Sequence, residues 1–186
     1  MNILYSAFIR EESESKGVLQ KVLSECFIFD KEFNNVYLYI SKQSEAVLYK
    51  VEDKVLEEIN TFSYPDFATF DSSSRLRKIK SFFRYNSFLT FLSKIIDLYE
   101  IDVLYFRYPQ PTNKLFNLAK KKDLIKIIEF LTYPYVEKYK KTLPTLEYYL
   151  FWKNGIKKIE DFADVIAGIT GDNQLKGDKK LVLINN

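Results

Sequence analysis

The architecture of this chain is indicated most directly by one segment, Asp102-Val103-Leu104-Tyr105-Phe106-Arg107-Tyr108-Pro109. Its apolar run from Val103 to Phe106 is unbroken, which is typical of a strand buried on both faces of a parallel sheet. Pro109 and Pro111 end the run, because proline has no N–H to donate to a strand ladder. We therefore predict a buried strand over 102–108, followed by a loop.

Outward from this strand, helical and strand patterns alternate in both directions. The other predicted strands are 3–9, 36–40, 46–51, 124–131, 163–170 and 180–184. The predicted helices are 17–27, 75–99, 113–122 and 147–161. The strands 36–40 and 46–51 are expected to form a hairpin, and 60–74 a loop. This alternation predicts one α/β domain over residues 1–186, with a mostly parallel sheet and helices on both faces.

Composition removes several classes of function. The 186 residues include no His and one Cys, which excludes a Ser-His-Asp triad, a His-ligated zinc site, an internal disulfide and a multi-Cys metal cage. Cys26 is expected to be a small buried apolar residue. We expect no metal site, because the acidic residues do not cluster at ligand spacing. The net charge, 28 − 25 = +3, is too small to indicate nucleic acid as the partner.

The hydropathy pattern predicts a soluble or peripheral protein. No apolar run approaches the ~20 residues of a membrane span. The first residues have the pattern of a strand and lack that of a signal peptide. Because a single Cys also fits a reducing compartment, we expect a cytoplasmic protein.

Ligands of parallel α/β sheets bind at the carboxyl ends of the strands, so function is expected in the loops there. After the first strand, Ser15, Lys16 and Gly17 stand at the start of a helix, where backbone N–H groups and the helix dipole favour a phosphate. The signal is weak, since the sequence matches neither a dinucleotide-binding motif nor a P-loop. The alternative is that Gly17 permits close packing and Lys16 is solvated.

A second group of polar and aromatic residues follows the strands 102–108 and 124–131. It consists of Arg107, Tyr108, Glu129, Thr132, Tyr133 and Tyr135. Neighbouring parallel strands would bring this group to one cleft, where a carboxylate and a guanidinium bind hydroxyls and Tyr rings stack on a sugar. The alternative is that the prolines only end the strands and the Tyr rings cover the loops.

The helix predicted over 75–99 begins with a segment that is both basic and aromatic. One hypothesis is that this helix lies on an anionic membrane surface. The residues concerned are Arg75, Arg77, Lys78, Lys80, Phe82 and Arg84. The alternative is a helix that covers the sheet and has a solvated basic face. Single-stranded nucleic acid is disfavoured, because no recognised binding motif accompanies the segment.

Five segments occur in a familiar order along the chain. They are Asn2-Ile3-Leu4-Tyr5, Asp102 to Pro109, Ile128-Glu129-Phe130-Leu131-Thr132-Tyr133-Pro134-Tyr135, Ala163-Asp164-Val165-Ile166 and Leu183-Ile184-Asn185-Asn186. Together they resemble the N-terminal domain of bacterial family 4-like glycosyltransferases of the GT-B fold, notably those that assemble capsular or other surface polysaccharides. The resemblance covers nearly the whole chain, and its R-Y-P and E-x-x-T-Y-P-Y segments are moderately specific.

The resemblance implies a Rossmann-like three-layer sandwich that forms the acceptor-side half of an enzyme. Such an enzyme transfers a hexosyl group from a nucleotide sugar to a glycan or lipid-linked acceptor. Ser15, Lys16 and Gly17 would then face the donor phosphates, and the group after the strands 102–108 and 124–131 would face the acceptor. The partner would be a C-terminal donor-binding domain, absent here, so this chain would hold no cofactor and would be inactive alone.

Two alternatives to this enzyme stay open at the level of sequence. One is a binding or docking module of the same fold without catalysis. The other is a peripheral protein on the inner face of the membrane that works through the helical segment 75–92.

Overall fold

The structure, a computed structural model, describes residues 1–8, 15–42, 44–65, 74–118, 124–130, 153–155, 158–168 and 181–183. The chain divides into two compact units, Met1–Val103 and Leu104–Asn186. Strands and helices alternate in both, and parallel strand pairs outnumber antiparallel ones among the described residues. The predicted fold class, a Rossmann-like α/β sandwich with a mostly parallel sheet flanked by helices, is confirmed.

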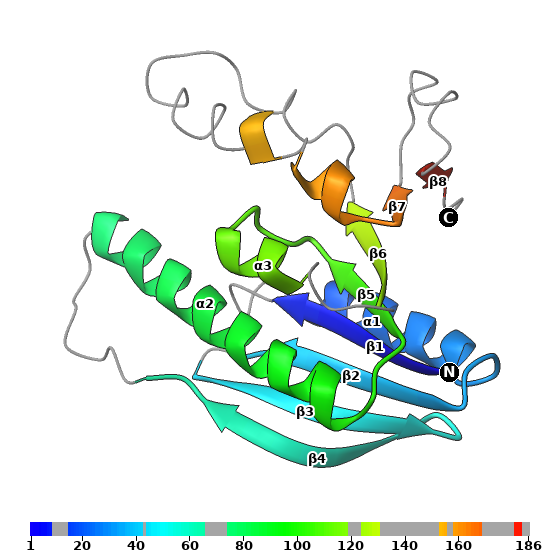
Figure 1. Ribbon diagram of the computed structural model, residues 1–186. Helices are drawn as coiled ribbons and strands as arrows, with labels where there is room; N and C mark the ends of the chain where they lie inside the picture. Colours follow the sequence, from blue (N-terminus) through cyan, green and yellow to red (C-terminus); the bar gives the residue numbers. More distant parts are fainter. Residues whose placement is uncertain are drawn as a thin grey trace. The chain divides into compact units, whose positions relative to one another are not determined.

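The strands of unit 1 follow the order β4-β3-β2-β1 across its sheet (Figure 1). They are β1 (Asn2–Phe8), β2 (Asn35–Ser41), β3 (Glu45–Glu52) and β4 (Val55–Ser63). β1 and β2 run parallel, with helix α1 (Ser15–Phe29) between them in the chain, whereas β2, β3 and β4 form an antiparallel meander. The hairpin predicted over 36–40 and 46–51 is therefore confirmed.

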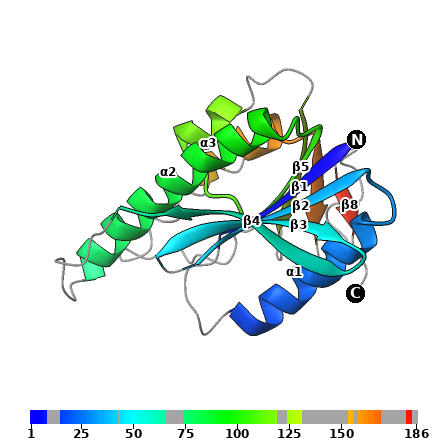
Figure 2. The same ribbon diagram turned by 90° about the horizontal axis from the view of Figure 1, so that it is seen from below.

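Helices α1 and α2 (Ser74–Leu98) cover opposite faces of the sheet in unit 1 (Figure 2). Side chains alternate along β1, so Tyr5 points to one face and Phe8 to the other. The Tyr5 hydroxyl donates a hydrogen bond of 2.6 Å to Glu25 Oε2 on α1. The Phe8 ring packs edge-on against Phe88 of α2, with the ring centroids 5.4 Å apart. The face of β1 that carries Phe8 is therefore the face covered by α2.

The layer between this sheet and α2 is an aromatic core. Phe88 stacks on Tyr39 of β2 with 4.4 Å between the ring centroids, and Tyr85 meets Phe8 edge-on at 5.1 Å. Phe88, Tyr39 and Tyr85 are all fully buried. Aromatic pairs of this kind contribute about 0.5–1.5 kcal/mol beyond the apolar area that they bury. Part of the high aromatic content of the chain therefore serves packing.

Strand β4 differs from the sequence analysis, which predicted no strand over 55–63 and began a loop at residue 60. β4 follows β3 through a two-residue turn, in which Asp53 and Lys54 have φ angles of 51° and 63°. Tight hairpin turns with positive φ at both positions usually carry Asn-Gly or Asp-Gly, so this turn has little sequence signal. Most residues of β4 are exposed, so the strand also lacks the alternation of apolar and polar residues that marks a half-buried strand.

The strands of unit 2 follow the order β5-β6-β7-β8. They are β5 (Val103–Arg107), β6 (Ile125–Phe130), β7 (Val165–Gly168) and β8 (Leu181–Leu183), and α3 (Asn113–Leu118) lies between β5 and β6 in the chain. β6, β7 and β8 pair in parallel. Each of these strands falls within its predicted range. Residues 153–155 and 158–162 are helical, and the rest of the helix predicted over 147–161 lies outside the described residues.

Gly155 allows a close approach between two segments of unit 2. A Cβ added at Gly155 would lie 2.3 Å from Pro111 Cγ and 2.5 Å from Pro111 Cβ, which is shorter than any real carbon contact. Only glycine therefore fits at this position. The segment 153–155 is thereby held against the turn that follows β5.

Cys26 lies on α1 with its side chain fully buried, as predicted. Burial raises the pKa of the Cys26 thiol far above its ordinary value, and the charge of Glu25 adds to this effect. The thiolate is the reactive form, so we expect Ellman's reagent to label Cys26 only after unfolding. Rapid labelling of the native chain would contradict this placement. The unfolded chain loses the thiol proton above about pH 8.5 while the folded chain keeps it, so folding stability should fall as the pH rises past that value.

Candidate functional site

The candidate site lies in unit 1, at the carboxyl ends of the parallel strands β1 and β2 and on the face covered by α2. β1 contributes Phe8 and β2 contributes Ser41, the last residue of each strand. Tyr64 follows β4, and Arg84 comes from α2. We call these four residues the Arg84 cluster. This edge of a parallel sheet is where open α/β folds bind their ligands.

Arg84 is the centre of the cluster. Its Nη2 donates a hydrogen bond of 2.6 Å to the backbone carbonyl oxygen of Lys42. Its guanidinium carbon lies 5.7 Å from the ring centroid of Phe8 and 5.4 Å from that of Tyr64, within the range of cation–π attraction. Arg84 is 9% exposed, which is rare for an arginine without a carboxylate partner, and none of the described carboxylates is paired with it.

Hydrogen bonds fix the polar groups around Arg84. The Tyr64 hydroxyl donates to Ser41 Oγ at 2.7 Å, and Ser41 Oγ donates to the carbonyl oxygen of Lys42 at 3.3 Å. The backbone N–H of Tyr64 donates to the carbonyl oxygen of Ser44 at 2.9 Å, which holds the chain after β4 against the turn between β2 and β3. The Lys42 carbonyl therefore accepts hydrogen bonds from both Ser41 and Arg84.

The charge of Arg84 has no acidic counterpart among the described residues. No ion pair includes it, and the ammonium of the adjacent Lys42 is directed to Glu45, 3.7 Å away. Burial lowers the pKa of the Arg84 guanidinium, while Tyr64 acts in the opposite direction. Burial raises the pKa of Tyr64, so this hydroxyl stays neutral at physiological pH. Among the described residues, the cluster thus presents a buried positive charge that no carboxylate compensates.

Two buried side-chain polar atoms of the described residues make no hydrogen bond, and both lie in the layer between the sheet of unit 1 and α2. They are Arg84 Nε and Ser6 Oγ. Ser6 precedes Phe8 by two residues on β1, so its side chain is on the same face of the sheet. A buried donor without an acceptor costs about 1–3 kcal/mol. Arg84 Nε is therefore a buried donor with no acceptor among the described residues.

The position of Arg84 corrects one expectation from the sequence. Arg84 was grouped with the basic residues of a membrane surface, but it is buried against the sheet because it precedes the buried Phe88 by one helical turn. Phe82, by contrast, is half exposed. The other members of that surface lie on α2 by their backbone positions, while their side chains are outside the described set: Arg75, Arg77, Lys78 and Lys80.

The proposed phosphate-facing residues lie at the start of α1. This helix begins at Ser15, two residues before its predicted start, and the side chains of Ser15 and Lys16 are outside the described set. Gly17 is exposed, and no described atom lies within 4 Å of a Cβ added there. The alternative of close packing around Gly17 therefore finds no support among the described residues. Phosphate binding at this helix start stays a prediction.

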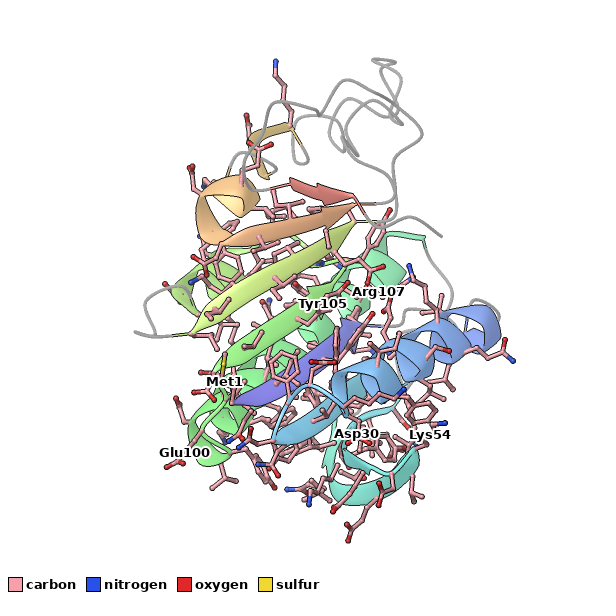
Figure 3. The ribbon with its side chains drawn as sticks, turned by 90° about the vertical axis from the view of Figure 1, so that its right-hand side faces the viewer. Met1, Asp30, Lys54, Glu100, Tyr105 and Arg107 are labelled. Atoms are coloured by element: carbon pink, nitrogen blue, oxygen red, sulfur yellow. The ribbon has the colours of Figure 1, made fainter. Side chains whose placement is uncertain are left out.

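The second predicted group is partly described in unit 2. Arg107 Nη1 donates to both carboxylate oxygens of Glu129, at 2.9 and 3.2 Å. The backbone N–H of Tyr108 donates to the carbonyl oxygen of Glu129 at 2.9 Å. Arg107 ends β5, two residues after Tyr105 (Figure 3). The carboxyl ends of β5 and β6 thus lie side by side. Thr132, Tyr133 and Tyr135 lie outside the described residues.

The Arg107–Glu129 pair is enclosed within unit 2. The two side chains are 6% and 0% exposed, so their charges compensate each other inside the fold. Tyr108, the next residue, has a φ of 57°, in the left-handed region, and its ring lies 6.0 Å from that of Phe130. Strain of this kind often marks functional segments. A ligand at this position stays a prediction. The Arg84 cluster differs in that its charge has no carboxylate partner within the described part of the chain.

Sequence reasoning missed most of the Arg84 cluster. One signal was present, because Arg84, Phe88, Leu92 and Ile95 recur at helical spacing and share the buried stripe of α2. Ser41 and Tyr64 carry no comparable signal. They meet only because the meander brings the residue after β4 back to the end of β2.

Two further features bear on function. Among the described residues, no three His, Cys, Asp or Glu side chains are grouped so that they could hold a metal ion. None of the described helices is long and apolar enough to cross a bilayer.

Comparisons with known proteins correct the family expected from the sequence. No family model matches the chain, and no curated protein matches it. Among solved structures, a match is a secreted C11 cysteine protease from Bacteroides thetaiotaomicron, with a TM-score of 0.38 and 7% identity. The match covers 57% of this chain and 28% of that protease, which is too weak a likeness to carry an argument. The expected family 4-like glycosyltransferase is wrong, since no match supports it, and the hexosyltransferase function inferred from it falls as well.

Proposed function

We propose that unit 1 binds an anionic ligand, through a phosphate or carboxylate group, at the Arg84 cluster. The observation that carries this proposal is the buried guanidinium of Arg84, which has no carboxylate beside it among the described residues and an Nε without an acceptor. An anion would supply both the missing charge and the missing acceptor. Arginine is suited to this role, since its planar fork of N–H donors matches the oxygens of phosphates and carboxylates.

The surroundings of Arg84 favour a bound anion in two ways. Phe8 and Tyr64 flank the guanidinium and exclude water, which strengthens its attraction to an opposite charge. The hydrogen bond to the Lys42 carbonyl fixes the orientation of the guanidinium before a ligand arrives. A preorganised donor loses less entropy on binding than a mobile surface arginine.

The location of the cluster supports the same function. Parallel strands β1 and β2 end beside it, and α1 connects them in the chain. Open α/β sheets bind ligands beyond the carboxyl ends of such strands. An arginine that served only to tie α2 to β2 would be expected to have a carboxylate partner, as Arg107 has in unit 2.

This proposal predicts that anions stabilise the folded chain through Arg84. Sodium phosphate, pyrophosphate and citrate should raise the melting temperature relative to sodium chloride at matched ionic strength. Arg84→Met should weaken phosphate binding, measured by isothermal titration calorimetry, by about 10- to 100-fold. This range follows from the ~1.5–3 kcal/mol that hydrogen bonds from a charged group contribute.

Two variants control for charge and for folding. Lys94→Met removes a positive charge from the exposed side of the same helix and should leave phosphate binding unchanged. Arg84→Lys keeps the charge but loses the fork, so it should bind more weakly than the natural chain and more tightly than Arg84→Met. Equal phosphate affinity in the natural chain and in Arg84→Met, or no stabilisation by any of the three anions, would refute the proposal.

A further inference from the structure

Helix α2 carries a second apolar surface in addition to the one that packs on the sheet. Phe82 is 50% exposed and Phe83 is 48% exposed, and their rings meet edge-on with centroids 6.1 Å apart. The next residues, Arg84 and Tyr85, are buried. The helix therefore turns one side toward the sheet and presents two adjacent aromatic rings on the other.

Helical geometry extends this second surface toward the start of α2. At 100° per residue, positions 76 and 79 share the side of the helix that carries Phe82 and Phe83. The sequence places Leu76 and Ile79 there. The buried stripe of α2 is formed by Phe88, Leu89, Leu92, Ile95 and Ile96. At 100° per residue, positions 76 and 79 lie on the side of the helix opposite this stripe.

The charge of this part of the chain is entirely positive. Residues 75–80 include Arg75, Arg77, Lys78 and Lys80, and no acidic residue occurs between positions 74 and 96. The start of α2 also extends beyond the strands of unit 1 (Figures 1 and 2). An apolar stripe bordered by basic positions at a projecting helix end has the composition of a segment that lies in the interface of an anionic bilayer.

We propose that the first half of α2 docks on an anionic lipid surface through the side that carries Phe82 and Phe83. The aromatic rings enter the boundary between headgroups and acyl chains, and the basic residues of 75–80 contact the lipid phosphates. This interaction uses the side of the helix opposite the Arg84 cluster. Anion binding at Arg84 and membrane docking therefore succeed or fail independently.

Vesicle sedimentation tests the proposal with the full chain. We expect binding to vesicles of phosphatidylcholine mixed with phosphatidylglycerol, and much weaker binding to phosphatidylcholine alone or at high salt. Phe82→Ser should lower the partition constant about tenfold, since it removes a ring that would enter the bilayer. Lys78→Gln and Lys80→Gln should each lower it about fivefold.

Two variants at the other end of the helix are matched controls. Leu98→Ser changes an equally apolar residue that is 72% exposed, and Lys94→Gln removes an exposed charge. Neither should change vesicle binding. A chain with Trp152→Phe and Phe82→Trp should show a blue shift of tryptophan emission with anionic vesicles, which reports entry of residue 82 into an apolar phase.

Three outcomes would overturn the proposal. Equal binding to neutral and anionic vesicles would remove the role of charge. Equal loss of vesicle binding in Leu98→Ser and Phe82→Ser would show that binding does not depend on the side of α2 that carries Phe82 and Phe83. Self-association that Phe82→Ser abolishes, together with no vesicle binding, would assign the surface to a second copy of the chain.

Discussion

Replacing Glu129 with alanine should lower the free energy of unfolding by about 3–5 kcal/mol. The carboxylate of Glu129 accepts two hydrogen bonds from Arg107 Nη1, and both side chains are buried. The variant leaves the buried guanidinium of Arg107 without this counter-charge. An unpaired buried charge destabilises the fold by more than the ion pair stabilises it, because the charge has lost its hydration and has no partner in its place.

Urea denaturation followed by circular dichroism measures this effect. The double variant Arg107→Met with Glu129→Leu removes both charges together and should lie within about 1 kcal/mol of the natural chain. Glu52→Ala is the control, since it breaks an exposed pair with Lys50 at 2.7 Å and should leave stability almost unchanged. Similar effects of Glu129→Ala and Glu52→Ala would show that the Arg107–Glu129 pair is not buried.

Replacing Phe88 with alanine should lower the free energy of unfolding by about 3–5 kcal/mol. The ring is fully buried, stacks on Tyr39 and packs edge-on against Phe8. The substitution loses the buried apolar area of the Phe88 ring and its contacts with the rings of Tyr39 and Phe8. It also leaves a cavity that these rigid neighbours cannot fill.

Phe82→Ala is the matched control for Phe88→Ala. It is the same substitution on the same helix, at a ring that is half exposed, and it should change stability by less than about 1 kcal/mol. Urea denaturation of the two variants under the same conditions compares them directly. Equal destabilisation would mean that α2 is rotated about its axis relative to the arrangement described above.

Much of the fold follows from patterns that are local in sequence. β5 carries an unbroken apolar run from Val103 to Phe106, and β1 carries one interrupted only by Ser6. Both strands are buried along most of their length, and such runs are visible without a structure. β4 was missed for the opposite reason. It lies at the end of the sheet in unit 1 with most of its residues exposed, so burial imposes no pattern on it.

The candidate site was less accessible to sequence reasoning. The predicted contact between the ends of β5 and β6 is present, because neighbouring strands bring the end residues Arg107 and Glu129 together. The Arg84 cluster depends on tertiary contacts between α2, β2 and the residue after β4, which no local pattern encodes. Composition was misleading there, because the basic residues before Arg84 suggested that Arg84 is exposed. Its position on the same face of α2 as Phe88 makes it buried.

The exposed strand β4 also bears on how this protein avoids sticking to itself. An outermost strand presents backbone groups that invite pairing with strands of other molecules. In unit 1 the pairing of β4 with β3 shifts register between Leu48 and Tyr49, which bends the strand, and Glu57 and Glu58 place negative charges along it. Irregularity and like charges are the usual protection against edge-to-edge aggregation. The same lack of pattern that hides β4 from sequence analysis thus helps to keep separate molecules apart.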